Sequence, residues 1–148
     1  MQFQARDPDF ERKIRDSFDR QSFMTNLGAR LDHITPGRCE ISAPISTEAL
    51  QQHGYAHAGL AFSLGDSAAG YSALSLMKPG QEVLTIEMKI NLVAPAKGDT
   101  LIARGSVVRP GRTISVVAAE VFTQADNAEI LVAKLQGTMI TAEPQADA

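Results

Sequence analysis

The chain has 148 residues, a formal net charge of −3 and 44% hydrophobic residues, which suits one globular domain with a single core. An acidic chain without a dense Lys/Arg cluster is not expected to bind nucleic acid or an anionic membrane surface as its main partner. The sequence has neither the roughly 20 apolar residues of a membrane span nor a secretory signal at its start, so a cytoplasmic location is expected.

The first third of the chain predicts one helix and two strands. Apolar residues at four-residue intervals among charged ones indicate a short amphipathic helix over 8–21. Strands are expected over 28–34 and 39–45, separated by a Thr-Pro-Gly turn signal. A brief helical turn capped by Ser46 or Thr47 follows.

The segment after His57 has the pattern of a buried helix over 58–76. It carries an apolar stripe beside a stripe of small residues, namely Leu60, Leu64, Ala68 and Tyr71 beside Ala58, Ala61, Gly65, Ala69 and Ser72. Gly65 and Gly70 would each weaken an isolated helix by about 1 kcal/mol. We therefore expect surrounding structure to hold this helix and to approach it closely.

The second half of the chain has the pattern of strands. Apolar residues at even positions and polar residues at odd positions over 84–92 predict one strand, with its apolar face on the helix and Thr85 on the polar face. Three turn-linked strands are expected after it, over 100–109, 113–124 and 129–141. These elements predict an α+β domain over 1–148: an antiparallel β-sheet of five or six strands wrapped around one central α-helix, with a frayed tail over 142–148.

One carboxylate, Asp66, lies among the small and apolar residues of HGYAHAGLAFSLGDSAAGY, which spans 53–71. Acidic side chains are rarely placed in this way unless they are paired or functional. Asp66 is therefore a candidate catalytic group, and the alternative is a structural carboxylate bonded to backbone or to Ser67. Ala58 and Gly59 lie where unpaired amides at a helix N-terminus could stabilise a carbonyl oxygen that gains charge.

The order of elements, with HGYAHAGLAFSLGDSAAG opening the central helix and TIEMKINLVAPAKGD following it, resembles the hotdog-fold thioesterases of the PaaI type over 27–141. The resemblance implies hydrolysis of acyl-CoA thioesters in a homodimer or homotetramer with active sites at the subunit interface. It implies no metal or redox cofactor, since coenzyme A is part of the substrate. The lone Cys39 and the absence of zinc-site spacing agree with this.

The resemblance also implies roles for residues of the helix start. The catalytic carboxylate of the family matches Asp66, and its His-Gly-Gly turn matches His57, Ala58 and Gly59. Ala58 takes the position of the oxyanion donor, where glycine is usual. His57 lies nine residues before Asp66 and thus on the opposite helix face, so we expect it to brace the turn or to contact the thioester rather than to act as the base.

Other residues are candidates for supporting roles. The water-orienting amide of the family matches Gln51, with Gln52 as the alternative register, and the hydroxyl from the facing subunit matches Thr85. Each could equally be an ordinary surface or strand residue. Phe62 lies on the same helix face as Asp66 and, with Gly59, is a candidate for substrate binding.

Coenzyme A carries phosphates, so basic side chains are expected at the mouth of the site. Arg109, Arg112 and Lys89 are candidates for this contact, and all three could instead be solvated surface charges.

The sequence leaves the reaction open in two respects. Asp66 could activate water as a general base or attack the carbonyl itself. A hotdog dehydratase or hydratase and a non-catalytic acyl-CoA binder are alternatives to a thioesterase, because the fold alone does not determine activity.

Overall fold

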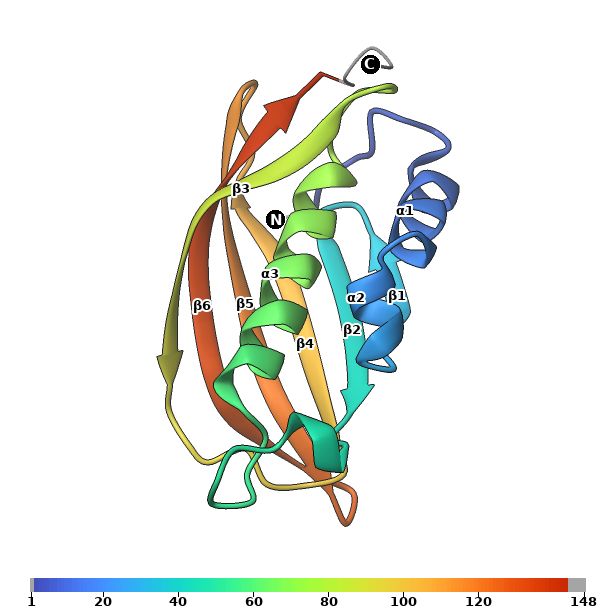
Figure 1. The fold of residues 1–148 in the computed structure, drawn as a ribbon. Helices are drawn as coiled ribbons and strands as arrows, with labels where there is room; N and C mark the ends of the chain where they lie inside the picture. The colour runs from blue at the N-terminus through green and yellow to red at the C-terminus, as the bar shows by residue number, and fades with distance from the viewer. Residues whose placement is uncertain (1, 144–148) are drawn as a thin grey trace.

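The computed structural model describes residues 2–143, which form one antiparallel sheet wrapped around a long helix (Figure 1). This arrangement confirms the predicted α+β architecture. The elements in chain order are α1 (Phe10–Asp19), α2 (Ser22–Asn26), β1 (Arg30–Thr35), β2 (Arg38–Pro44), the 3-10 turn η1 (Thr47–Ala49), α3 (Ala58–Leu74), β3 (Glu82–Leu92), β4 (Thr100–Arg109), β5 (Ile114–Ala125) and β6 (Ala128–Ala142).

The six strands have the order β1-β2-β4-β5-β6-β3, and every neighbouring pair is antiparallel. The predicted meander is present as β4, β5 and β6. Strand β3 follows α3 and pairs with β6 only, so its second edge has no strand partner within residues 2–143. An 11-residue strand with a free edge offers main-chain groups to another chain.

Small residues let α3 lie very close to the sheet. A side chain at Gly105 on β4 would place its Cβ 2.2 Å from the carbonyl carbon of Ala68 and 2.5 Å from the nitrogen of Ala69. At Gly65 an added Cβ would lie 2.8 Å from a methyl group of Leu135 on β6. The predicted close approach to the helix is thus confirmed, with glycine on both the helix and the strand.

The N-terminal segment differs from the single helix expected over 8–21. It forms α1 and a second short helix, α2, and the next strand begins at Arg30, after Gly28 turns the chain with a φ of +66°. Ile14 and Phe18 of α1 are buried, and the Phe18 ring meets the ring of Tyr71 edge-on at 6.1 Å. Residues 2–143 contain no helix with the length and apolar character needed to cross a membrane.

The apolar face predicted for 84–92 is wrong in its first half. A β-bulge at Ile86 shifts the register, because Thr85 pairs with Met139 and Glu87 with Thr138. Before the bulge Thr85 therefore points toward α3, while Leu84 and Ile86 stay 60% and 52% exposed. The prediction of a frayed tail over 142–148 is wrong at Ala142, which ends β6, and residues 144–148 lie outside the described range.

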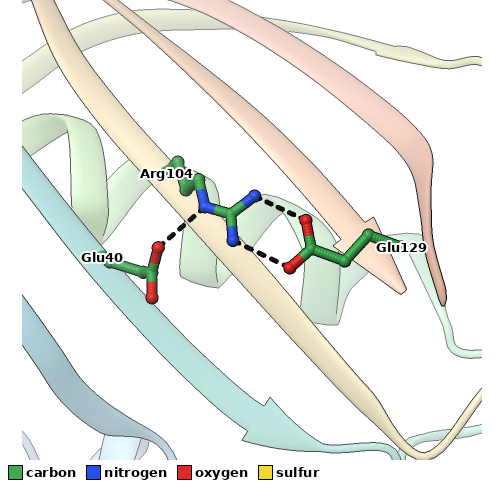
Figure 2. Close-up of polar contacts among 3 residues, drawn as sticks. All are labelled: Glu40, Arg104 and Glu129. Atoms are coloured by element: carbon green, nitrogen blue, oxygen red, sulfur yellow. Dashed lines mark hydrogen bonds and ion pairs between the residues drawn. The ribbon is translucent and has the colours of Figure 1, made fainter. Parts of the chain in front are cut away.

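Charged side chains cover the sheet face that points away from α3. Figure 2 shows the side chain of Arg104 on β4 between two carboxylates. Two of its guanidinium nitrogens donate to the two oxygens of Glu129 at 2.7 and 2.8 Å, and the third donates to Glu40 of β2 at 2.7 Å. The guanidinium lowers the pKa of Glu129, and the two carboxylates raise the pKa of Arg104. The three side chains keep 25% to 41% of their surface exposed, so solvent screens these ion pairs and reduces what they add to stability.

Candidate active site

Asp66 lies in the middle of α3 and is half-buried. The Thr85 hydroxyl donates a hydrogen bond of 2.9 Å to its Oδ1 atom. Within residues 2–143 no other hydrogen bond and no ion pair engages this carboxylate. Burial raises the pKa of the Asp66 carboxyl, and the bond from Thr85 acts in the opposite direction. The group is thus a carboxylate with a free oxygen.

The prediction that Thr85 lies on the strand face away from its own helix is wrong, whereas its role toward a facing subunit stays a prediction. Its hydroxyl contacts Asp66 of its own chain, because the bulge at Ile86 turns Thr85 toward α3. Sequence alternation could not reveal this contact, since one extra residue in a strand reverses the face of every residue before it.

A cavity of about 210 Å³ lies beside Asp66. Its walls come from α3, β3, β6 and the N-terminal helices: Ser17, Gln21, Asp66, Ser67, Gly70, Tyr71, Leu74, Glu82, Val83, Thr85 and Met139. The apolar groove expected around Asp66 is therefore a cavity of mixed polarity. Phe62 does not line this cavity and is 37% exposed on α3.

His57 caps the N-terminus of α3. Its Nδ1 atom accepts the Gly59 N–H at 2.8 Å, and its own backbone N–H donates to the Ala49 carbonyl. The predicted bracing role of His57 is thereby confirmed. The Gly59 amide is occupied by this cap, whereas the Ala58 N–H has no acceptor within residues 2–143. Ala58 therefore carries the amide that is free to bind a ligand oxygen.

Ala58 lines a second cavity, of about 570 Å³. Gln51, Tyr55 and His57 line it, together with the end of β3 at Leu92. Gln51 is held in a tight turn, where its side-chain oxygen accepts the His53 N–H. Gln51 thus lies at this cavity and the exposed Gln52 does not line it, and the water-orienting role of Gln51 stays a prediction.

The two halves of the predicted site are separated within one chain. Ala58 and Asp66 are eight residues apart on α3, and a rise of 1.5 Å per residue puts them about 12 Å apart along the axis. One carbonyl group cannot contact both. We call the group of Asp66 and Thr85 the carboxylate half-site, and the group of Gln51, His57 and Ala58 the amide half-site.

The basic candidates lie away from both half-sites. Lys89 points to the sheet face opposite α3, where it lines a hollow with Arg104 and Lys134. Arg109 and Arg112 are exposed at the turn between β4 and β5 and line neither half-site cavity. Lys89 therefore cannot contact a substrate held at Asp66 of its own chain.

Sequence reasoning missed Ser17 and Gln21, which reach the cavity of the carboxylate half-site. Both bond the Tyr71 hydroxyl, at 3.2 and 2.5 Å. Tyr71, which belongs to the apolar stripe predicted for this helix, is buried, but helical periodicity gave no signal of hydrogen-bond partners about 50 residues away. Cys39 is buried as well, and burial raises the pKa of its thiol to about 12.

No group of three or more His, Cys, Asp or Glu side chains in the described part of the chain is placed to hold a metal ion. The chemistry available to the two half-sites comes from a carboxylate, a hydroxyl and a free main-chain amide. Such groups can activate water and stabilise a charged oxygen, and a hydrolase needs both functions.

Comparisons with known proteins agree with this class. The profile of the thioesterase superfamily matches residues 53–130, and the chain belongs to this family of thioester hydrolases. A protein of Halobacterium salinarum named "Putative esterase" is 35% identical over 122 residues, which span 78% of this chain and 80% of that one.

Solved structures give the same result. A thioesterase family protein from Silicibacter pomeroyi superposes with a TM-score of 0.89 at 41% identity, covering 91% of this chain and 99% of that one. The PaaI protein from the phenylacetic acid degradation operon of E. coli has a TM-score of 0.82 at 22% identity, covering 90% and 94%. The second likeness concerns the fold alone.

Proposed function

We propose that this protein is an acyl-CoA thioesterase, which hydrolyses a small or medium acyl or aryl thioester to the free acid and coenzyme A. The observation that carries the proposal is the Asp66 carboxylate: half-buried, without an ion pair in the described residues, and facing a cavity with one free oxygen. A structural carboxylate would be expected to have its lone pairs occupied by neighbouring donors.

The proposed reaction uses Asp66 as a general base. The carboxylate takes a proton from water, the hydroxide oxygen bonds to the thioester carbon, and the carbonyl oxygen becomes negatively charged. The Ala58 N–H stabilises this oxygen, and the carbon–sulfur bond then breaks to release the thiolate, which takes up a proton. Thr85 holds one carboxylate oxygen, so the other is free to face water. Direct attack by Asp66 is the alternative route.

We further propose that the two half-sites meet in a homodimer, which is the minimum assembly and could be extended to a homotetramer. The support is the free edge of β3. If two β3 strands pair antiparallel about their midpoints, the end carrying Glu82 and Thr85 in one copy lies beside the end carrying Leu92 in the other. The first end lines the Asp66 cavity and the second lines the Ala58 cavity.

In this proposal each active site combines the carboxylate half-site of one subunit with the amide half-site of its partner. The distance of about 12 Å between the two in a single chain is then no obstacle. A cytoplasmic location is part of the same proposal. Arg109 and Arg112 are kept as candidates for the coenzyme A phosphates, from either subunit.

The test is thiol release from a panel of acyl- and aroyl-CoA substrates by the wild type and by Asp66→Asn. The proposal predicts release by the wild type and its collapse in the variant. Asp16→Asn makes the same change at an exposed position of α1 and should leave the rate unchanged. Hydration of an enoyl-CoA without thiol release, binding without turnover, or an unaffected Asp66→Asn variant would each contradict the proposal.

A further inference from the structure

We infer that Ser67, the residue after Asp66 on α3, holds the water molecule that Asp66 activates. The inference deepens the proposed function and rests on it, because it assigns a second partner to the same attacking water. Ser67 is half-buried and lines the cavity of about 210 Å³ together with Asp66 and Thr85. A carboxylate and a hydroxyl group from adjacent helical residues therefore border the same space.

The hydroxyl group of Ser67 differs from those of the neighbouring serines on α3. Ser63 and Ser72 each donate a hydrogen bond of 2.7 Å to a carbonyl of their own helix, which is the usual arrangement for serine in a helix interior. Within residues 2–143 the Ser67 hydroxyl makes no such bond, and it does not contact Asp66. The alternative of Asp66 as a structural carboxylate bonded to Ser67 thus has no bond to support it.

A half-buried hydroxyl without a protein partner needs a water molecule or a ligand to satisfy it. The Asp66 carboxylate has the same need at one oxygen, because Thr85 engages only the other. One water molecule can meet both needs, since a carboxylate oxygen and a serine oxygen both accept hydrogen bonds. The two residues together therefore form a binding site for one water.

A water molecule bound in this way has a defined orientation. It donates one hydrogen to the free oxygen of Asp66 and the other to the oxygen of Ser67, so its lone pairs are left for the thioester carbon. When the oxygen–carbon bond forms, Asp66 takes the first hydrogen as a proton. The second hydrogen stays on the oxygen, which becomes the hydroxyl of the carboxylic acid product once the carbon–sulfur bond has broken.

Ser67 and Thr85 have different tasks in this arrangement. Thr85 donates to the carboxylate itself and so favours its ionised form. Ser67 contacts the water and leaves the charge of Asp66 unchanged. Gln51, the residue predicted to orient water, lines the other cavity and belongs to the partner's half of the proposed composite site. Ser67 thus positions the water from the same chain as the base.

The test compares Ser67→Ala with Ser63→Ala in thiol release from the acyl- and aroyl-CoA panel. Ser63 is the matched control, because it lies one turn earlier on α3 and lines neither half-site cavity. Both variants should fold, since alanine favours a helix more than serine does. Ser67→Ala should lower kcat by about tenfold, as expected for one hydrogen bond to the reacting water. Its KM should change by less than about twofold, and Ser63→Ala should keep the wild-type rate.

Two further measurements separate a water-holding role from a structural one. Ser67→Thr keeps the hydroxyl group and should restore most of the lost rate. The acid limb of the kcat/KM profile should stay in place in Ser67→Ala, because the variant removes no bond to the carboxylate. A limb that moves to higher pH would show that Ser67 stabilises ionised Asp66 directly, and it would overturn the inference.

Failure of the inference and failure of the proposed function are distinguishable. Asp66-dependent thiol release that is as fast in Ser67→Ala as in the wild type overturns the inference alone. A loss of rate that Ser63→Ala shares also overturns it, and so does a raised KM with an unchanged kcat, because Ser67 would then bind substrate. Absence of any Asp66-dependent thiol release overturns the proposed function and the inference with it.

Discussion

Replacing Ala58 by proline removes one hydrogen-bond donor from the proposed site and almost nothing else. Ala58 is the first residue of α3, where proline is well tolerated because the N–H has no helical partner. The preceding residue, His57, has φ −61° and ψ 141°, the extended conformation that a residue before proline prefers. The Ala58 N–H has no acceptor within residues 2–143, so no internal hydrogen bond is lost.

The expected effect is therefore on the rate and not on the fold. Loss of a single oxyanion donor lowers kcat by about 10² to 10³, which corresponds to about 2.7 to 4 kcal/mol of transition-state stabilisation. The free energy of unfolding should change by less than about 1 kcal/mol, because the helix keeps its cap and all its backbone bonds.

The assay follows thiol release by wild type, Ala58→Pro and Ala58→Gly, together with chemical denaturation of each. Ala58→Gly keeps the amide and restores the residue usual in the family, so it separates the donor from the side chain. If Ala58→Pro folds normally and turns over substrate at the wild-type rate, the Ala58 amide is not the oxyanion donor and the reasoning is refuted.

Three further predictions concern the carboxylate and the packing of α3. Thr85→Val removes the hydrogen bond that favours the ionised form of Asp66, so the pKa of Asp66 should rise further. The acid limb of the kcat/KM profile should then move to higher pH, and an unmoved limb would exclude the contact. Because burial raises the pKa of folded Asp66 above its unfolded value, wild-type stability falls as pH rises between those values. Asp66→Asn should therefore have a higher Tm than the wild type at neutral pH, with the gap closing in acid, and a lower Tm would contradict this sign. Gly105→Ala should lower the free energy of unfolding by more than about 3 kcal/mol in urea titrations, because the added methyl group meets the backbone of α3. Gly65→Ala should lower it by only about 1 to 2 kcal/mol, because its methyl group meets the movable side chain of Leu135. Equal losses in the two variants would refute this distinction.

Much of the fold could be predicted because its signals are local. The small and apolar stripes identified α3, and the Asp-Asn turn at 126–127 joined two long strands as expected. The bulge at Ile86 could not be predicted, because an isoleucine within an alternating run gives no sign that it is the extra residue. The division of the N-terminal segment into α1 and α2 falls at Arg20 and Gln21, where no proline or glycine signals a break.

The candidate site could be predicted as residues but not as an arrangement. Asp66 was identifiable by its apolar neighbours in sequence, and His57 by its place before the helix. Their separation into two half-sites follows from the number of helical residues between them, and this number can be read from the sequence. The contact between Tyr71 and Gln21 beside the Asp66 cavity required the structure, since the two residues meet only after the N-terminal helices pack.

The central claim is that Asp66 of one subunit acts with the Ala58 amide of the other, and a mixed dimer tests it most directly. One subunit carries Asp66→Asn and the other Ala58→Pro, and differently tagged chains are co-expressed so that the heterodimer can be isolated. Each homodimer should be nearly inactive, whereas the heterodimer contains one site with neither change and should recover about half of the wild-type rate per dimer. A heterodimer as inactive as its parents would contradict the account.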